Sequence, residues 1–90
     1  MFYTYVLLCT NSDGKKKFYV GSSSDLRSRL LSHKTKSVKT TKAYDKIELV
    51  YYEACLNKTD ATKRELQLKT GFGRGYIKRR LINYLNEVRD

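Results

Sequence analysis

Long apolar runs are absent from this sequence. No stretch of its 90 residues approaches the roughly 20 consecutive apolar residues that a helix needs to span a bilayer. The first residues lack a basic region followed by an apolar run of signal-peptide length. Low-complexity tracts and internal repeats are also missing. We therefore expect one folded domain over residues 1–90, located in the cytoplasm and without a membrane partner.

Cysteine is scarce, and its placement argues against two kinds of site. Cys9 and Cys55 are the two cysteines; they lie 46 positions apart, each within an apolar run. This spacing is not the C-x-x-C of zinc sites, and two cysteines are too few for the disulfide scaffold of a small secreted domain. The pattern predicts two buried thiols on strands.

Acidic residues are few, and this shortage gives the first indication of a partner. Only 9 Asp and Glu oppose 19 Lys and Arg, so the formal net charge is +10. Such a chain attracts polyanions, and counterion release from phosphates would give salt-dependent, largely sequence-independent affinity for nucleic acid. The charge alone would also suit an anionic membrane surface or a ribosome-associated protein. It says nothing about catalysis, and it leaves both a monomer and a weak dimer open.

The amino-terminal part of the sequence is typical of a β-hairpin. Residues 2–10 are aromatic and β-branched enough for a strand, residues 11–14 (NSDG) supply a turn, and residues 18–21 (FYVG) form a second strand. The hairpin tip then carries a basic run, which consists of Lys15, Lys16 and Lys17.

A helix is predicted next, over residues 22–33, because hydroxyl residues suited to capping precede a charged and apolar run. Leu26 and Leu30 lie four apart and should face the core, while Arg29 and His33, also four apart, share a neighbouring face. The segment 34–46 has no apolar period, so we expect a mobile basic loop. Its lysines are Lys34, Lys36, Lys39, Lys42 and Lys46.

The rest of the chain predicts one strand and two helices. Residues 47–55 alternate as a strand does; Asn57 or Thr59 can cap a helix that runs to about Lys69, where residues 71–75 (GFGRG) should break the chain. A last helix from about 75 to 88 carries an apolar stripe, formed by Ile77, Leu81, Tyr84, Leu85 and Val88. The order ββαβαα predicts an α+β fold with a three-stranded, mainly antiparallel sheet flanked by helices.

Two tripeptides on the predicted hairpin, with three residues downstream, carry a family resemblance. Tyr3-Thr4-Tyr5 and Tyr19-Val20-Gly21 resemble the two motifs that name the GIY-YIG nuclease family. In that family an arginine follows ten positions after the second motif's tyrosine and a histidine or tyrosine four later, which Arg29 and His33 match. Its metal-binding glutamate lies in an E-x-x-L-K pattern, which Glu65 to Lys69 reproduce.

The resemblance implies a metal-dependent endonuclease, and the residue types suit phosphodiester hydrolysis. Glu65 would hold one Mg²⁺ or Mn²⁺ ion through its carboxylate oxygens. Arg29 would grip the scissile phosphate with its planar guanidinium. Tyr5 and Tyr19 would position water, and near a metal and Arg29 a phenol could lose its proton more easily. The resemblance favours Tyr5 as the general base, but His33 could equally take or relay the proton.

Other features favour structural roles or depart from the family pattern. Many members have an asparagine about a dozen positions beyond the glutamate; Ile77 stands there in this chain. Glu65 and Lys69 could form a simple helical ion pair worth a few tenths of a kcal/mol. The remaining tyrosines are interpreted as packing residues: Tyr3, Tyr44, Tyr51, Tyr52, Tyr76 and Tyr84.

The predicted partner is DNA, with RNA as a weaker possibility. Backbone contacts would come from basic residues in the hairpin tip, the first helix, the basic loop and the carboxy-terminal part. These are Lys15, Lys16, Lys17, Arg27, Lys34, Lys36, Lys39, Lys42, Arg74, Lys78, Arg79 and, in the same cluster, Arg80. The alternative hypothesis is a catalytically inactive module that binds nucleic acid through its basic surface.

Overall fold

The computed structural model describes residues 1–87 and is built on a three-stranded antiparallel sheet. Its strands are β1 (Phe2–Thr10), β2 (Lys16–Ser23) and β3 (Lys46–Cys55). Its helices are α1 (Leu26–Lys34), α2 (Lys58–Leu68), α3 (Gly71–Arg80) and α4 (Ile82–Glu87). β1 lies between β2 and β3. The predicted α+β class and antiparallel sheet are confirmed.

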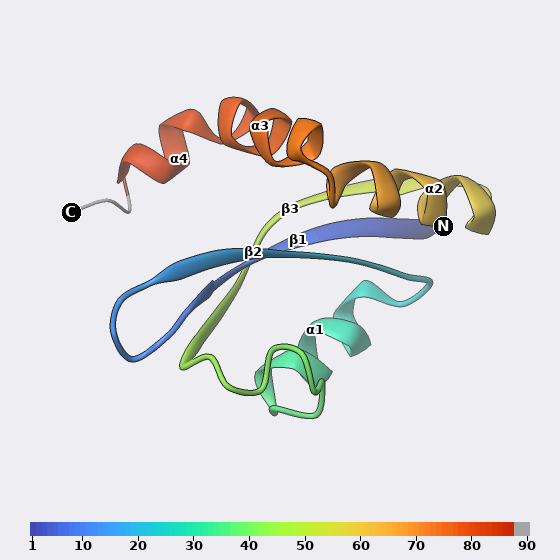
Figure 1. Ribbon diagram of the computed structural model, residues 1–90. Coiled ribbons are helices and arrows are strands. Elements are labelled where there is room, and N and C mark those ends of the chain that lie inside the picture. The colour runs from blue at the N-terminus through green and yellow to red at the C-terminus, as the bar shows by residue number, and fades with distance from the viewer. Residues whose placement is uncertain (88–90) are drawn as a thin grey trace.

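The helices cover the two faces of the sheet unequally. α1 lies against one face, while α2, α3 and α4 lie against the other (Figure 1). The side chains of β1 alternate between these layers. Tyr5, Leu7 and Cys9 pack toward α1 with Ile47, whereas Val6 packs with Val20, Leu68 and Ile77 on the other face. β1 is therefore buried on both sides, because helices cover both faces of the central strand.

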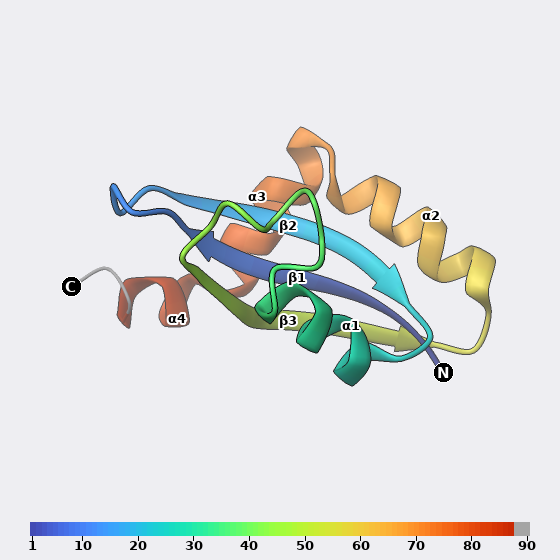
Figure 2. The same cartoon turned by 90° about the horizontal axis from the view of Figure 1, so that it is seen from below.

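The segment between α1 and β3 forms a series of turns with hydrogen bonds of its own, and the expected mobility of this segment stays a prediction. Residues 35–45 lie over the strands on the face that α1 covers (Figure 2). The backbone N–H groups of Thr41 and Lys42 donate to the Val38 carbonyl, and that of Asp45 donates to Thr10 on β1. Val38 and Thr41 are buried. The absence of an apolar period here fits a series of turns in which Val38 is the buried apolar residue.

Several predicted boundaries shift. Ser22 and Ser23 belong to β2, and Asp25 caps α1 by accepting a hydrogen bond from the Ser28 N–H. Asn57 caps α2, as one of the two predicted alternatives. Cys9 is buried, but Cys55, at the end of the edge strand β3, is only half-buried. The prediction of two buried thiols is therefore confirmed for Cys9 and wrong for Cys55.

The glycine-rich segment is helical, which corrects two predictions. The chain turns at Thr70, whose hydroxyl accepts a hydrogen bond from the Gly73 N–H, and α3 begins at Gly71. The predicted single last helix is divided, since α3 ends at Arg80 and α4 begins at Ile82. Four helices replace the three expected. Val88, the last member of the predicted apolar stripe, lies outside the described residues.

A polar cluster joins β3 to α2 and α3 on the face opposite α1. The Arg64 guanidinium donates two hydrogen bonds of 2.9 Å to the Glu53 carboxylate and lies 4.9 Å from the centroid of the Tyr76 ring. The Tyr51 hydroxyl donates to Glu53 and lies 3.3 Å from that of Tyr76. These contacts support the packing role expected for Tyr51 and Tyr76.

Among residues 1–87, no helix has both the length and the apolar character that a membrane span requires.

The corner between α2 and α3 supplies a stability test. A Cβ added to Gly73 would lie 2.2 Å from the Leu68 carbonyl oxygen, whereas one added to Gly71 would meet nothing within 4 Å. Gly73→Ala should therefore lower the free energy of unfolding by about 1–3 kcal/mol, because backbone atoms must move. Gly71→Ala should leave it within about 0.5 kcal/mol. Urea denaturation checks both; equal effects of the two substitutions would contradict the described corner.

Candidate active site

The pairing of β1 with β2 places the two tyrosine motifs side by side. Tyr5 stands opposite Gly21, and Leu7 stands opposite Tyr19. A Cβ at Gly21 would lie 2.5 Å from the Tyr5 hydroxyl oxygen. The phenol therefore lies directly over the glycine backbone, and only glycine leaves room for it there. This contact explains why the second motif ends in glycine.

α1 brings Arg29 and His33 to the same phenol. His33 Nε2 lies 2.9 Å from the Tyr5 hydroxyl, and Arg29 Nε donates to that hydroxyl at 3.3 Å. The Tyr19 ring meets the His33 ring edge-on, with centroids 5.0 Å apart. Four of the five predicted site residues are thus in one cluster on the α1 side of the sheet.

Glu65, the fifth residue, reaches the edge of the sheet from the opposite face. It lies on α2, and its Oε1 accepts a 2.6 Å hydrogen bond from Ser22 Oγ on the edge strand β2. Its Oε2 is bonded to Lys69 Nζ, also at 2.6 Å. The Glu65 side chain is 18% exposed. The carboxylate therefore does not touch the tyrosine cluster directly, and the β2 edge lies between them.

Glu65 lies close enough to the cluster for its charge to act on Tyr5 and Arg29. Burial alone would raise the pKa of Glu65, but hydrogen bonds from Lys69 and Ser22 and the charges of Lys69 and Arg29 together lower it. Conversely, the Glu65 charge contributes to raising the pKa of Tyr5. Glu65 is thus ionised at neutral pH and coupled to both Tyr5 and Arg29.

Tyr5 and His33 are both neutral groups held inside the protein. Burial raises the pKa of the Tyr5 phenol and outweighs the opposing hydrogen bond and charge of Arg29. Arg29 thus lowers the pKa of Tyr5 as expected, but less than burial raises it, and the predicted effect of a nearby metal stays a prediction. Burial, followed by the charge of Arg29, lowers the pKa of His33, whose exposed fraction is 0%. Its hydrogen bond to Tyr5 joins two neutral partners.

A basic groove follows the β2 edge beside this cluster. One part, of 360 Å³, is lined by Tyr19, Lys17, Lys69 and Arg74 among others. A second part, of 550 Å³, lies between the hairpin and α4. It shares Lys17 and Arg74 and adds Lys16 and Lys78. No carboxylate lines either part among the residues that the structure describes.

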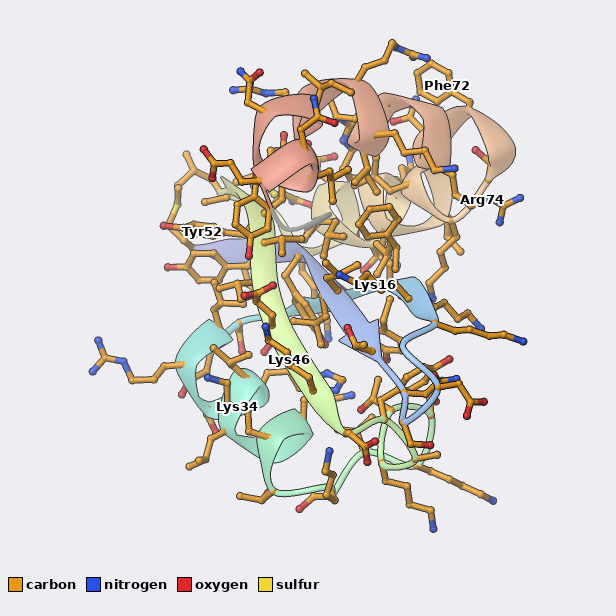
Figure 3. The ribbon with its side chains drawn as sticks, turned by 90° about the vertical axis from the view of Figure 1, so that its left-hand side faces the viewer. Lys16, Lys34, Lys46, Tyr52, Phe72 and Arg74 are labelled. Atoms are coloured by element: carbon orange, nitrogen blue, oxygen red, sulfur yellow. The ribbon has the colours of Figure 1, made fainter. Side chains whose placement is uncertain are left out.

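The predicted DNA contacts divide between the two faces of the molecule. Arg74 projects from α3, and Lys34 lies on α1 across the sheet from it (Figure 3). The groove gathers only part of the predicted set. The other predicted contacts do not line it: Lys15, Arg27, Lys34, Lys36, Lys39, Lys42, Arg79 and Arg80. Lys36 Nζ is used locally, as it donates to the Tyr44 carbonyl.

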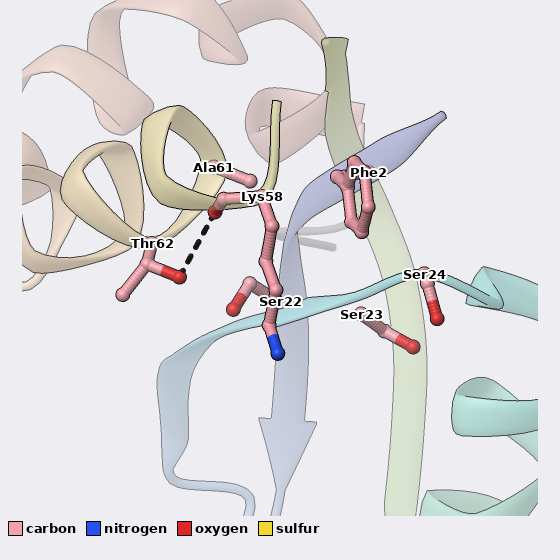
Figure 4. Close-up of a pocket in the computed structure, with 7 residues that line it drawn as sticks. All are labelled: Phe2, Ser22, Ser23, Ser24, Lys58, Ala61 and Thr62. Carbon is pink, nitrogen blue, oxygen red and sulfur yellow. Dashed lines mark hydrogen bonds between the residues drawn. The ribbon is translucent and has the colours of Figure 1, made fainter. Parts of the chain in front are cut away.

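A small pocket adjoins the site only through Ser22. It has a volume of 130 Å³, and its lining is apolar or hydroxylic apart from Lys58 (Figure 4). The one hydrogen bond drawn there joins Thr62 to the Lys58 carbonyl within α2. This pocket contains none of the five predicted site residues.

Glu65 fits the protein part of an open magnesium site. Residues 1–87 contain no cluster of three or more His, Cys, Asp or Glu side chains that could enclose a metal. Mg²⁺ keeps several waters and commonly binds through one or two carboxylates and substrate phosphates, so one ionised carboxylate beside a hydroxyl suffices. Glu65 would hold the ion, with Ser22 beside it. Manganese accepts the same oxygen ligands.

Two neighbours of the site have roles that the sequence did not assign, whereas Lys69 forms the helical ion pair with Glu65 that the sequence offered. Ser22 directly follows the second motif, so its position offered a signal. Thr41, which lies 2.8 Å from His33 Nδ1, offered none. Ile77, at the position of the family asparagine, is buried in the core beside Leu68. That position cannot contribute a carboxamide.

Burial of neutral His33 predicts a pH-dependent stability. The unfolded chain takes up a proton near the ordinary histidine pKa of 6.5, while the folded pKa is lower. The stability is therefore full above 6.5 and falls as the pH drops through that value toward the folded pKa. Urea unfolding of the wild type between about pH 7.5 and about pH 5 should show this loss. His33→Gln should reduce the slope of the unfolding free energy against pH. An unchanged slope would show that other groups cause the pH dependence.

Comparisons with known proteins agree with this geometry. The family model of the GIY-YIG catalytic domain matches residues 1–86. A UPF0213 protein of Bacillus pumilus is 34% identical over 88 residues, which cover 97% of this chain and 81% of the relative. UPF0213 protein SERP0126 of Staphylococcus epidermidis is 36% identical over 69 residues, covering 76% and 79%. No solved structure matches the chain. The chain therefore belongs to the GIY-YIG family of nuclease domains.

Proposed function

We propose that this protein is an endonuclease that hydrolyses DNA phosphodiester bonds with one divalent metal ion. The observation that carries the proposal is the Tyr5 hydroxyl, which is hydrogen-bonded to both His33 and Arg29 at the sheet edge that Glu65 approaches. This combination provides a proton acceptor, a phosphate-binding cation and a metal-binding carboxylate. The basic groove that Tyr19 lines beside this cluster favours a nucleic-acid substrate over a small phosphate ester.

Arg29 and Tyr19 are the groups placed to meet the phosphate. Both are half-buried, whereas Tyr5 is 1% exposed. Tyr19 lines the groove, and Arg29 interacts with both phenols. We assign Arg29 to the nonbridging oxygens of the scissile phosphate, which its planar fork suits. Tyr19 orients the phosphate or the attacking water in the groove.

Tyr5 and His33 together accept the proton of the attacking water. Water gives a proton to the Tyr5 oxygen as the Tyr5 hydroxyl proton moves to His33 Nε2, 2.9 Å away. The hydroxide so formed attacks phosphorus, and the bond from phosphorus to the leaving oxygen breaks. Because His33 has no exposed surface, it receives this proton through Tyr5 and not from water directly. The choice between the two candidate bases thus becomes a shared role.

Glu65 is the metal-binding residue in this proposal. When bound, a divalent ion would polarise the phosphate and stabilise charge on the leaving oxygen. Lys69 already neutralises the carboxylate in the protein alone, at 2.6 Å. A bound ion would therefore have to displace the Lys69 ammonium or share the Glu65 carboxylate with it.

Substitution of Glu65 separates the nuclease from the inactive-module alternative. Glu65→Gln keeps the side-chain volume and removes the charge, so metal-dependent cleavage should fall about 100-fold or more. DNA affinity measured in EDTA should stay within about twofold. Glu48→Gln on β3, away from the groove, is the matched control and should cleave normally. The assay is nicking of plasmid and of branched DNA with Mg²⁺ or Mn²⁺.

The wild type supplies the decisive comparison in that assay. An absence of metal-dependent cleavage across several DNA structures would support the binding-module alternative. Matched RNA and DNA hairpins test the substrate: faster cleavage of the RNA hairpin would overturn the assignment of DNA.

The groove predicts which cations contribute most to binding. Arg74 lines both of its parts. Arg74→Ala should weaken DNA binding and reduce the slope of log affinity against log salt by about 1, as expected for one lost phosphate contact. Lys63→Ala removes an exposed cation on α2 that does not line the groove, and it should change the slope little. Fluorescence anisotropy at several salt concentrations measures both slopes. If Arg74→Ala and Lys63→Ala give the same slope, the DNA does not lie in this groove.

A further inference from the structure

Thr41 is a buried residue in contact with the proposed proton acceptor. Its exposed fraction is 1%, and its Oγ1 lies 2.8 Å from His33 Nδ1. The other ring nitrogen, Nε2, faces the Tyr5 hydroxyl. His33 is therefore held between two hydroxyl groups, one on β1 and one on the segment between α1 and β3.

The hydrogen bonds on both sides of the His33 ring are satisfied together by one position of the imidazole proton. Arg29 Nε can only donate, so the Tyr5 oxygen accepts from it. The single Tyr5 proton can then be donated to the remaining partner, His33 Nε2. In this arrangement Nε2 presents its lone pair. A neutral imidazole carries one N–H, which therefore lies on Nδ1 and donates to Thr41 Oγ1.

We propose that Thr41 is a positioning residue that fixes the His33 tautomer and so makes Nε2 the acceptor of the Tyr5 proton. The inference rests on the proposed function insofar as Tyr5 is the group to be activated. When the Tyr5 proton moves to Nε2, the products are a phenolate and an imidazolium. The imidazolium Nδ1–H keeps its bond to Thr41, so no hydrogen bond is lost in the transfer.

The segment that carries Thr41 is built to hold it in place. The Thr41 N–H donates to the Val38 carbonyl, and the Thr41 carbonyl accepts from the Tyr44 N–H. Val38 is buried, and Asp45 N–H ties the end of the segment to Thr10. Thr41 is thus anchored through its backbone on both sides, independently of its bond to His33.

A hydroxyl partner also differs in effect from a carboxylate partner. The groups that face the His33 ring are Tyr5 on β1, Tyr19 on β2, Arg29 on α1 and Thr41. None of them is anionic, and Arg29 disfavours a second positive charge. The His33 ring therefore stays neutral before the reaction and can accept a proton. A carboxylate partner would instead raise the pKa of His33 and favour the imidazolium, which has no free lone pair to accept a proton.

His33 is the only histidine in the chain, so its tautomer can be measured without ambiguity. Long-range ¹H–¹⁵N correlation spectra of the imidazole distinguish Nδ1–H from Nε2–H in the full-length protein, without DNA or metal. The wild type at about pH 8, above the ordinary histidine pKa, should show the proton on Nδ1. Thr41→Ser should keep this pattern because it keeps the hydroxyl. Thr41→Val should give a mixture or the opposite tautomer, while Thr62→Val, on α2, should match the wild type.

Kinetics supply the second readout. In Thr41→Val, kcat for DNA cleavage should fall about 10- to 100-fold, as for loss of other groups that orient a histidine. KM and DNA affinity in EDTA should be unchanged, and Thr41→Ser should restore kcat. A wild-type proton on Nε2, or a folded Thr41→Val with the wild-type tautomer, would overturn the inference. An inactive wild type with the expected tautomers would instead overturn the nuclease proposal and leave the positioning role of Thr41 intact.

Discussion

The site depends on the hydroxyl of one buried tyrosine and the space that a glycine leaves for it. Tyr5 lies on the central strand, opposite Gly21, and its ring occupies the volume that a side chain at Gly21 would fill. From this position its hydroxyl reaches His33 and Arg29, which α1 presents four residues apart. Any residue larger than glycine would displace the phenol from both partners. The pairing of β1 with β2 and the position of α1 thus place the groups of the proposed chemistry around one atom, the Tyr5 hydroxyl oxygen.

The edge of β2 explains how residues from opposite faces can share one site. α1 and α2 lie on different faces of the sheet, so their side chains could not meet through its middle. β2 is an edge strand, and Ser22 on it bonds Glu65 while Tyr19 on it contacts His33. A phosphate lying along this edge would be reached from both sides. The groove lined by Tyr19, Lys69 and Arg74 follows the same edge.

The sequence predicted those parts of the structure that local rules decide. Aromatic and β-branched content in residues 2–10 and alternation in residues 47–55 predicted the strands, and the four-residue spacing of Arg29 and His33 placed both on one helical face. Glu65 was harder, because spacing cannot tell which face of the sheet a helix covers. The predicted end of the second helix near Lys69 is confirmed, since α2 ends at Leu68, but residues 71–75 begin α3 and do not form a break of their own. Propensity disfavours a helix in this glycine-rich segment, but packing of Gly73 on the backbone of Leu68 allows one.

Thr41 was missed for a related reason: its bond to His33 joins residues that no periodicity relates.

The β2 edge, in our proposal, assembles one catalytic centre from both faces of the sheet. A crystal structure with Mn²⁺ and a short DNA duplex tests this assembly most directly. We expect anomalous density for manganese at the Glu65 carboxylate, with a DNA phosphate between it and the Arg29 guanidinium. Manganese bound elsewhere, or a phosphate backbone that runs over α1 or α3 without reaching this edge, would contradict it.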